Sequence, residues 1–188
     1  CYSISDGSKK EANSLSLAAL NNILSHEMHS RIFGKARKAG WIYHLSCGRS
    51  VSATGLTSWE IYAQVGVENI DNVLNLVVDE LQKLKKSGLS IKEVEEAKLA
   101  IKGSLRMSHQ TVGDIMEFYK GHYNSREDEE IRYLEEADKW VESVTPESIQ
   151  KLFLNLIKTK KWGAGFLGNV TEAKAKKWNA KLAEIFED

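Results

Sequence analysis

Residues 41 to 67 read WIYHLSCGRSVSATGLTSWEIYAQVGV, and the spacing of their apolar side chains decides the fold. Apolar side chains recur at every second position in both halves of this stretch: Tyr43, Leu45 and Cys47, then Trp59, Ile61, Ala63, Val65 and Val67. Period two is the spacing of a half-buried β-strand. With a turn at Thr54 and Gly55, the stretch predicts an antiparallel hairpin that turns one face toward a core.

Helical spacing dominates on both sides of the hairpin. The strongest case places Ile70, Val73, Leu74, Val77, Leu81 and Leu84 on one face of a helix that ends before Gly88. The other expected elements are a strand over 1–5, helices over 15–24 and 28–39, a helix after the Ser90–Glu93 capping box, helices over 112–123 and 129–144, a helix after Thr145 and Pro146, a strand over 162–167, and a last helix after Thr171.

This order predicts an α+β fold, with a mainly antiparallel sheet and helices packed on one of its faces. We find no internal repeat and no proline- or glycine-rich linker, so residues 1–188 are expected to form a single domain. The chain starts at Cys1, inside an expected strand, and we expect it to be the C-terminal part of a longer chain.

Composition excludes several classes of partner. Lysine plus arginine equals aspartate plus glutamate at 26 each, so no net field attracts the chain to nucleic acid or to an anionic membrane. No apolar run approaches the ~20 residues that span a bilayer. We therefore expect a soluble protein with no nucleic-acid or membrane partner, and a cytoplasmic location is slightly favoured over others.

The segment from His26 to His29 is the first candidate for chemistry, because two imidazoles and a carboxylate lie within four residues. Zinc peptidases use HExxH or HxxEH, with the histidines four positions apart on one helical face. Here they are three apart, between two expected helices, so a polar helix junction is the favoured interpretation. Cys47 is interpreted as a small buried thiol. No GxSxG, P-loop or GxGxxG motif is present.

Ser30 to Tyr43 reads SRIFGKARKAGWIY and resembles a motif of the pitrilysin family of zinc metallopeptidases, which includes insulin-degrading enzyme and mitochondrial processing peptidase. The motif, roughly S-S-R-L-F-x-x-L-R-E-x-x-L-A-Y, belongs to the C-terminal halves of these proteins. It is matched here at Ser30, Arg31, Ile32, Phe33, Arg37, Gly40, Ile42 and Tyr43. The segments LQKLKKSGLS, IKEVEEAKLAIKGSL and VTPESIQKL resemble the same family domain in the same order.

The resemblance implies a non-catalytic half-domain. The chain has no HxxEH, so it resembles the inactive kind of domain, which closes over the substrate opposite the zinc-bearing kind. It implies substrate binding by Arg37 and Tyr43, no catalytic and no metal-binding residue in this chain, and zinc in an HxxEH-bearing partner domain or subunit. The expected ligand is an unstructured peptide, and the chain alone should be inactive.

Elementary chemistry is compatible with that assignment. A guanidinium fork and a phenol are donors that can reach a peptide carbonyl, and Gly40 can reverse the chain between Arg37 and Tyr43 so that both face one cleft. Taken without the resemblance, Tyr43 is a core-facing strand residue and Arg37 a helix-end cation. Two other functions stay open: a structural core-type subunit of a larger assembly, and an independent metalloenzyme that uses His26 and His29.

Overall fold

The computed structural model describes residues 1–5, 14–51, 57–125 and 134–187. Its strands are β1 (Tyr2–Ser5), β2 (Ile42–Val51), β3 (Thr57–Val65) and β4 (Trp162–Ala164). Its helices are α1 (Ser14–Asn21), the π-helical turn η1 (Asn22–His26), α2 (Phe33–Lys38), α3 (Ile70–Ser87), α4 (Ile91–Met107), α5 (Val112–Ser125), α6 (Ala137–Glu142), α7 (Pro146–Lys158) and α8 (Glu172–Ala183). Short 3-10 turns precede α3 and α6 and follow α8.

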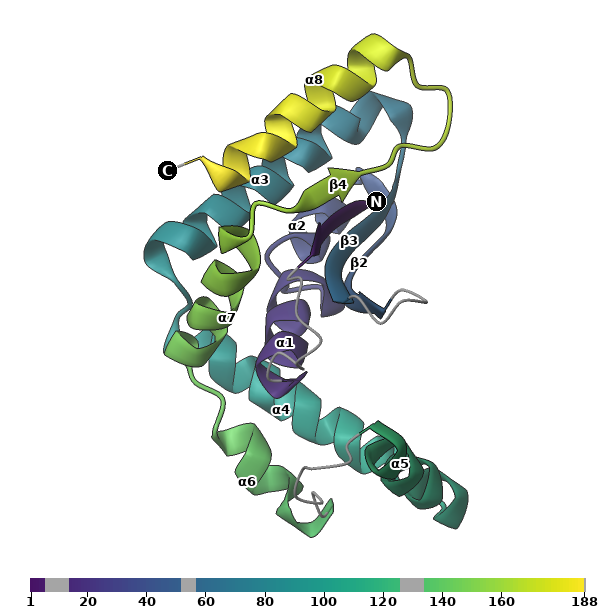
Figure 1. Ribbon diagram of the computed structural model, residues 1–188, viewed down its shortest axis with the longest axis vertical. Coiled ribbons are helices and arrows are strands. Elements are labelled where there is room, and N and C mark those ends of the chain that lie inside the picture. The colour runs from purple at the N-terminus through teal and green to yellow at the C-terminus, as the bar shows by residue number, and fades with distance from the viewer. Residues whose placement is uncertain (6–13, 52–56, 126–133, 188) are drawn as a thin grey trace.

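The four strands form one antiparallel sheet in the order β2-β3-β1-β4. The expected α+β fold is confirmed, and so is the pairing of the two halves of the hairpin. The predicted turn at Thr54 and Gly55 lies outside the described residues. Figure 1 shows α3 and α8 side by side above the sheet, whereas α4, α5 and α6 extend away from it.

One face of the sheet is apolar and the other is polar, as the period of two predicts. The apolar face presents Ile4, Trp59 and Ile61, each at most 5% exposed, toward the helices. Trp59 links three elements: its ring packs edge-on against Phe153 of α7, at 6.4 Å between centroids, and its Nε1 donates to Asn21 Oδ1 of α1 at 2.8 Å. The sheet is therefore fixed to α1 and α7 through one side chain.

A β-bulge interrupts the alternation at the start of β2. Ile42 is opposite Val65 and His44 is opposite Gln64, so Tyr43 is the extra residue. Ile42 and Leu45 are buried, whereas Tyr43 and His44 between them are both exposed. The prediction that Tyr43 shares a face with Leu45 is therefore wrong, and so is the interpretation of Tyr43 as a core-facing residue.

The segment between α1 and β2 is less helical than its sequence predicts. The helix expected over 15–24 changes into the π-helical turn η1, and the helix expected over 28–39 is reduced to α2. The chain returns onto η1 instead, where Arg31 N donates to Ile23 O at 2.8 Å. Gly34 permits this return, because a Cβ there would lie 2.3 Å from Met28 O.

Local signals fix the ends of three other helices. Ser90 and Glu93 form the predicted capping box of α4, and Thr145 with Pro146 opens α7. Thr171 caps α8 by accepting a hydrogen bond from Lys174 N. The strand expected over 162–167 ends at Ala164. Part of the helix expected over 129–144 lies outside the described residues; of the remainder, Leu134–Glu136 form a 3-10 turn and Ala137–Glu142 form α6, which ends two residues earlier than expected.

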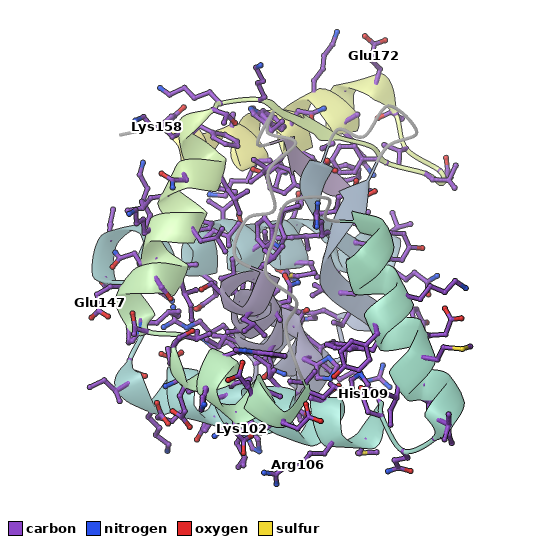
Figure 2. All side chains as sticks on the ribbon, turned by 60° about the horizontal axis from the view of Figure 1, so that its bottom comes forward. Lys102, Arg106, His109, Glu147, Lys158 and Glu172 are labelled. Carbon is purple, nitrogen blue, oxygen red and sulfur yellow. The ribbon has the colours of Figure 1, made fainter. Side chains whose placement is uncertain are left out.

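Ion pairs connect the part of the molecule that lies away from the sheet. Lys98 and Lys102 of α4 both contact the carboxylate of Glu142 in α6, and Arg106 contacts Asp138 at 3.3 Å. Figure 2 shows Lys102 and Arg106 along α4, with His109 near the start of α5. The Arg106–Asp138 pair is largely exposed and contributes little stability, whereas the side chains of Lys98 and Lys102 are 10% and 21% exposed.

Candidate functional site

Arg37 and Tyr43 are brought together at the start of β2. Arg37 lies in the last turn of α2, and the chain then reverses at Gly40, whose φ is +72°. Arg37 Nη1 donates to Ile42 O at 3.0 Å and to Tyr43 O at 3.4 Å. The guanidinium therefore binds the backbone of the bulge, and it approaches Tyr43 through its carbonyl oxygen.

The helix that carries Arg37 is anchored to α3 by a buried carboxylate. Lys35 Nζ of α2 lies 2.8 Å from Glu80 Oε1, and Glu80 is 3% exposed. Burial acts against the charged form of Glu80, but hydrogen bonds from Lys35 and Lys83 outweigh it and lower the pKa of that carboxyl below its ordinary value. Lys35 and Arg37 lie on the same short helix, so this ion pair helps to fix the position of Arg37 relative to α3.

The phenol of Tyr43 is 77% exposed and belongs to a cluster of polar aromatic groups at this end of the hairpin. Tyr62 and Gln64 of β3 lie close by, and Gln64 Nε2 donates to Tyr62 Oη at 3.3 Å. The His44 ring contacts the Tyr62 ring, with 6.1 Å between centroids. We call the two tyrosines Tyr43 and Tyr62, together with the Gln64 amide beside them, the aromatic rim.

The aromatic rim borders an apolar cavity of about 810 Å³. Its walls come from residues 1–2, from β2 and β3, from α3, from residues 165–170 and from α8. The apolar side chains among these are Leu45, Ile61, Ala63, Val65, Ile70, Val73, Leu74, Val77, Phe166, Leu167, Val170 and Leu182. Sequence reasoning found neither the cavity nor Tyr62 and Gln64. The outward positions of the strand over 59–67 were the only signal for those two residues.

Arg31, a matched residue of the motif, contacts Glu93 rather than the aromatic rim. Arg31 Nε and Nη2 donate to the two carboxylate oxygens of Glu93 at 2.6 and 2.9 Å, a bidentate pair. Arg31 lowers the pKa of the Glu93 carboxyl to about 2, from an ordinary value of 4.5, against the opposing effect of burial. Two segments 62 positions apart are thereby joined, so we assign Arg31 a structural role.

The depressed pKa of Glu93 predicts acid sensitivity. Its contribution to stability is fully present above about pH 4.5 and is lost as the pH falls toward 2, because the folded state then has to bind the proton. The pair is partly exposed, so after screening we expect a loss of about 1–2 kcal/mol. Urea denaturation of the wild type and of Glu93→Gln from pH 6 to pH 2.5 measures it. The difference in free energy of unfolding between the wild type and Glu93→Gln should shrink as the pH falls. A difference that stays constant with pH would contradict the lowered pKa of Glu93.

The described residues offer no metal site. No three His, Cys, Asp or Glu side chains among them are grouped so as to hold a metal ion. His26, Glu27 and His29 are exposed at the end of η1 and in the turn after it. Burial raises the pKa of the Cys47 thiol to about 12, so this side chain is neutral at physiological pH. The described residues therefore lack the donor set that zinc needs.

Helices in the described part of the chain are too short or too polar to cross a bilayer.

Comparisons with known proteins identify the family. The sequence model of the peptidase M16 inactive domain matches residues 3–101, somewhat more than half of the 188 residues. The uncharacterized zinc protease YmxG of Bacillus subtilis is 31% identical over 102 residues, which cover 53% of this chain and 24% of that protein. The chain therefore matches about a quarter of the length of this curated relative.

Solved structures share the fold at low sequence identity. A protease from Helicobacter pylori superimposes with a TM-score of 0.70 and 13% identity, over 86% of this chain and 38% of that one. A putative zinc protease from Bordetella pertussis superimposes with a TM-score of 0.67 and 11% identity, over 89% of this chain and 91% of that one. The matched segment carries the hairpin, the Arg31–Glu93 pair and the Arg37–Tyr43 pair. The chain belongs to the peptidase M16 inactive domain family.

Proposed function

We propose that this chain is the non-catalytic, substrate-binding domain of a zinc-dependent endopeptidase. It holds an extended peptide with Arg37 and Tyr43, while the HxxEH motif and zinc are supplied by a partner domain or subunit. One observation supports this more than any other: a 77% exposed phenol on a β-bulge whose backbone is bound by a guanidinium. An exposed aromatic side chain on a rigid bulge adds little to packing, but it is available to a ligand.

Both side chains retain donors for a peptide. Arg37 uses Nη1 for the backbone of the bulge, and its Nε and Nη2 have no partner among residues 1–5, 14–51, 57–125 and 134–187. The phenol of Tyr43 supplies a further O–H. Because the bulge holds the guanidinium in place, less side-chain freedom is lost when a peptide carbonyl accepts its hydrogen bonds.

The path of the peptide follows from the edges of the sheet. An extended peptide can add to an unpaired edge strand, and β2 is an edge strand of this sheet. Cys47 N of β2 already donates to Ser25 Oγ of η1 at 2.8 Å, so η1 occupies the edge there. We therefore propose that the peptide crosses the Tyr43 end of the hairpin rather than pairing along the whole of β2.

Binding of a fluorescein-labelled unstructured peptide, measured by anisotropy, tests the proposal. We expect Arg37→Ala and Tyr43→Ala each to weaken binding about tenfold, which corresponds to about 1.4 kcal/mol. Lys38→Ala removes the neighbouring exposed cation and is the matched control, with an expected change of less than about twofold. Tyr43→Phe removes only the hydroxyl and separates its hydrogen bond from contact with the ring.

Reconstitution with an HxxEH-bearing M16 domain provides the second measurement. Peptide turnover by the pair should fall with Arg37→Ala and Tyr43→Ala and stay unchanged with Lys38→Ala. Unchanged affinity and unchanged turnover in both variants would remove the proposed role of these side chains.

A second candidate is a structural, core-type subunit of a larger assembly that handles no peptide. It is favoured by exposed apolar side chains on α4 and α5, of which Leu99, Met107 and Val112 are 73%, 73% and 85% exposed. In that case no peptide binds, and replacing these three residues by serine reduces association with the assembly. Peptide binding that depends on Arg37 would decide for the first function.

A further inference from the structure

The apolar cavity beside the aromatic rim is open to solvent on one side. Its volume of about 810 Å³ lies in the range of small-ligand pockets. Its lining residues at the surface include Tyr43, Tyr62 and Leu167, which are 77%, 44% and 105% exposed. These three exposed side chains thus border one hollow and are not scattered singly over the surface.

The walls of the cavity are held by specific contacts. Phe166 packs on Trp178 of α8 with 5.1 Å between ring centroids. Trp178 Nε1 in turn donates to Asp71 Oδ1 of α3 at 2.8 Å, and Lys177 Nζ donates to Asp71 Oδ2 at 2.9 Å. Gly165 N donates to Cys1 O at 2.8 Å and continues the ladder of β1 and β4. Residues 165–170 are thereby fixed to both α8 and the sheet, so specific contacts define the shape of the hollow.

The chemistry of the lining selects an uncharged group. None of the described side chains that line the cavity is Asp, Glu, Lys, Arg or His. Among the lining residues the one charged group is the amino group of Cys1, which already donates to Gly165 O at 2.8 Å, so a charged ligand group would lose its hydration there with little compensation. Tyr2 also lines the cavity; it is 5% exposed, and its hydroxyl has no hydrogen-bond partner among the described residues. Burial raises the pKa of that phenol, so it stays neutral.

We infer that this cavity is a specificity pocket for a bulky, uncharged side chain of the bound peptide, of the size of leucine, phenylalanine or tyrosine. The inference rests on the proposed function, because Tyr43 belongs both to the rim of the cavity and to the Arg37–Tyr43 pair. A peptide whose backbone is held by that pair has the cavity directly beside it. The two donors match peptide carbonyls, which favours a peptide over a free hydrocarbon as the occupant.

Four labelled peptides that differ at one central position, with Phe, Leu, Ala or Asp there, test the pocket by anisotropy. Burying a Leu or Phe side chain predicts at least tenfold tighter binding of these two peptides than of the Ala peptide, and the Asp peptide should bind no better than the Ala peptide. Equal affinity for all four would overturn the pocket and leave the proposed function intact.

Two substitutions that fill the cavity provide a second test of the pocket. Ala63→Phe places a ring in the cavity, and Leu74→Trp does so from α3, which keeps the test decisive should one variant be less stable. Either variant should reduce the preference for Phe over Ala to within about twofold, while the Ala peptide still binds through Arg37 and Tyr43. Ala173→Phe, on the exposed first turn of α8, is the matched control and should keep the full preference.

The remaining outcomes separate the two hypotheses. Failure of every peptide to bind would overturn the proposed function and the pocket together. A preference that survives both filling variants would overturn the pocket alone. Tight binding of decanol that Ala63→Phe abolishes, with no preference among the peptides, would assign the cavity to a free hydrocarbon ligand and overturn the peptide assignment.

Discussion

Replacing Trp59 by alanine is expected to lower the free energy of unfolding by about 3–5 kcal/mol, the range for truncating a buried aromatic side chain. Trp59 is 1% exposed, packs on Phe153 and donates to Asn21. Its loss would open a cavity between the sheet, α1 and α7 and would leave Asn21 Oδ1 without this donor. Urea denaturation monitored by far-UV circular dichroism gives the value.

Tyr43→Ala is the matched control for Trp59→Ala. Both variants remove a large aromatic side chain from neighbouring strands, but Tyr43 is 77% exposed. We expect a change within about 0.5 kcal/mol. A cost for Tyr43→Ala that approaches that of Trp59→Ala would show that Tyr43 belongs to the core, and its assignment to substrate binding would then lose its main support.

Arg31→Ala is expected to cost about 2–3 kcal/mol. The variant leaves the Glu93 carboxylate, which is partly buried, without its bidentate partner and frees the turn after η1 from the start of α4. The carboxylate would still cap α4 through Ser90, so we expect a less stable protein that keeps its fold. Thermal and urea denaturation at pH 7 measure the effect.

Arg106→Ala is the control of the same residue type. Arg106 pairs with Asp138, but the two side chains are 74% and 58% exposed, compared with 17% and 29% for Arg31 and Glu93. Solvent screens such a pair, so a change within about 0.5 kcal/mol is expected. Equal effects of the two variants would contradict the structural role of Arg31.

Patterns with a short repeat made most of the fold predictable. A period of two located β2 and β3, a helical period located α3, and capping residues located the starts of α4, α7 and α8. These signals depend on neighbours within a few positions. Residues 28–32 escaped them, because the chain there is held by hydrogen bonds to η1 and by the close approach of Gly34 to Met28.

The site was predictable only in part, for a physical reason. The motif places Arg37 and Tyr43 near each other in sequence, and the structure keeps them close, but one extra residue in β2 reverses the side to which Tyr43 points. The partner of Arg31 is 62 positions away. The cavity joins residues from β1 through α8, so no local pattern could reveal it.

The most direct test of the peptide-holding role is nuclear magnetic resonance with tyrosine ring carbons labelled with ¹³C. The Tyr43 signal is assigned by its absence in Tyr43→Phe, and an unstructured peptide is then added. We expect this signal to move on titration and Arg37→Ala to weaken the response. Peptide that binds to saturation while the Tyr43 signal stays unmoved would contradict the role of Tyr43 in holding the peptide.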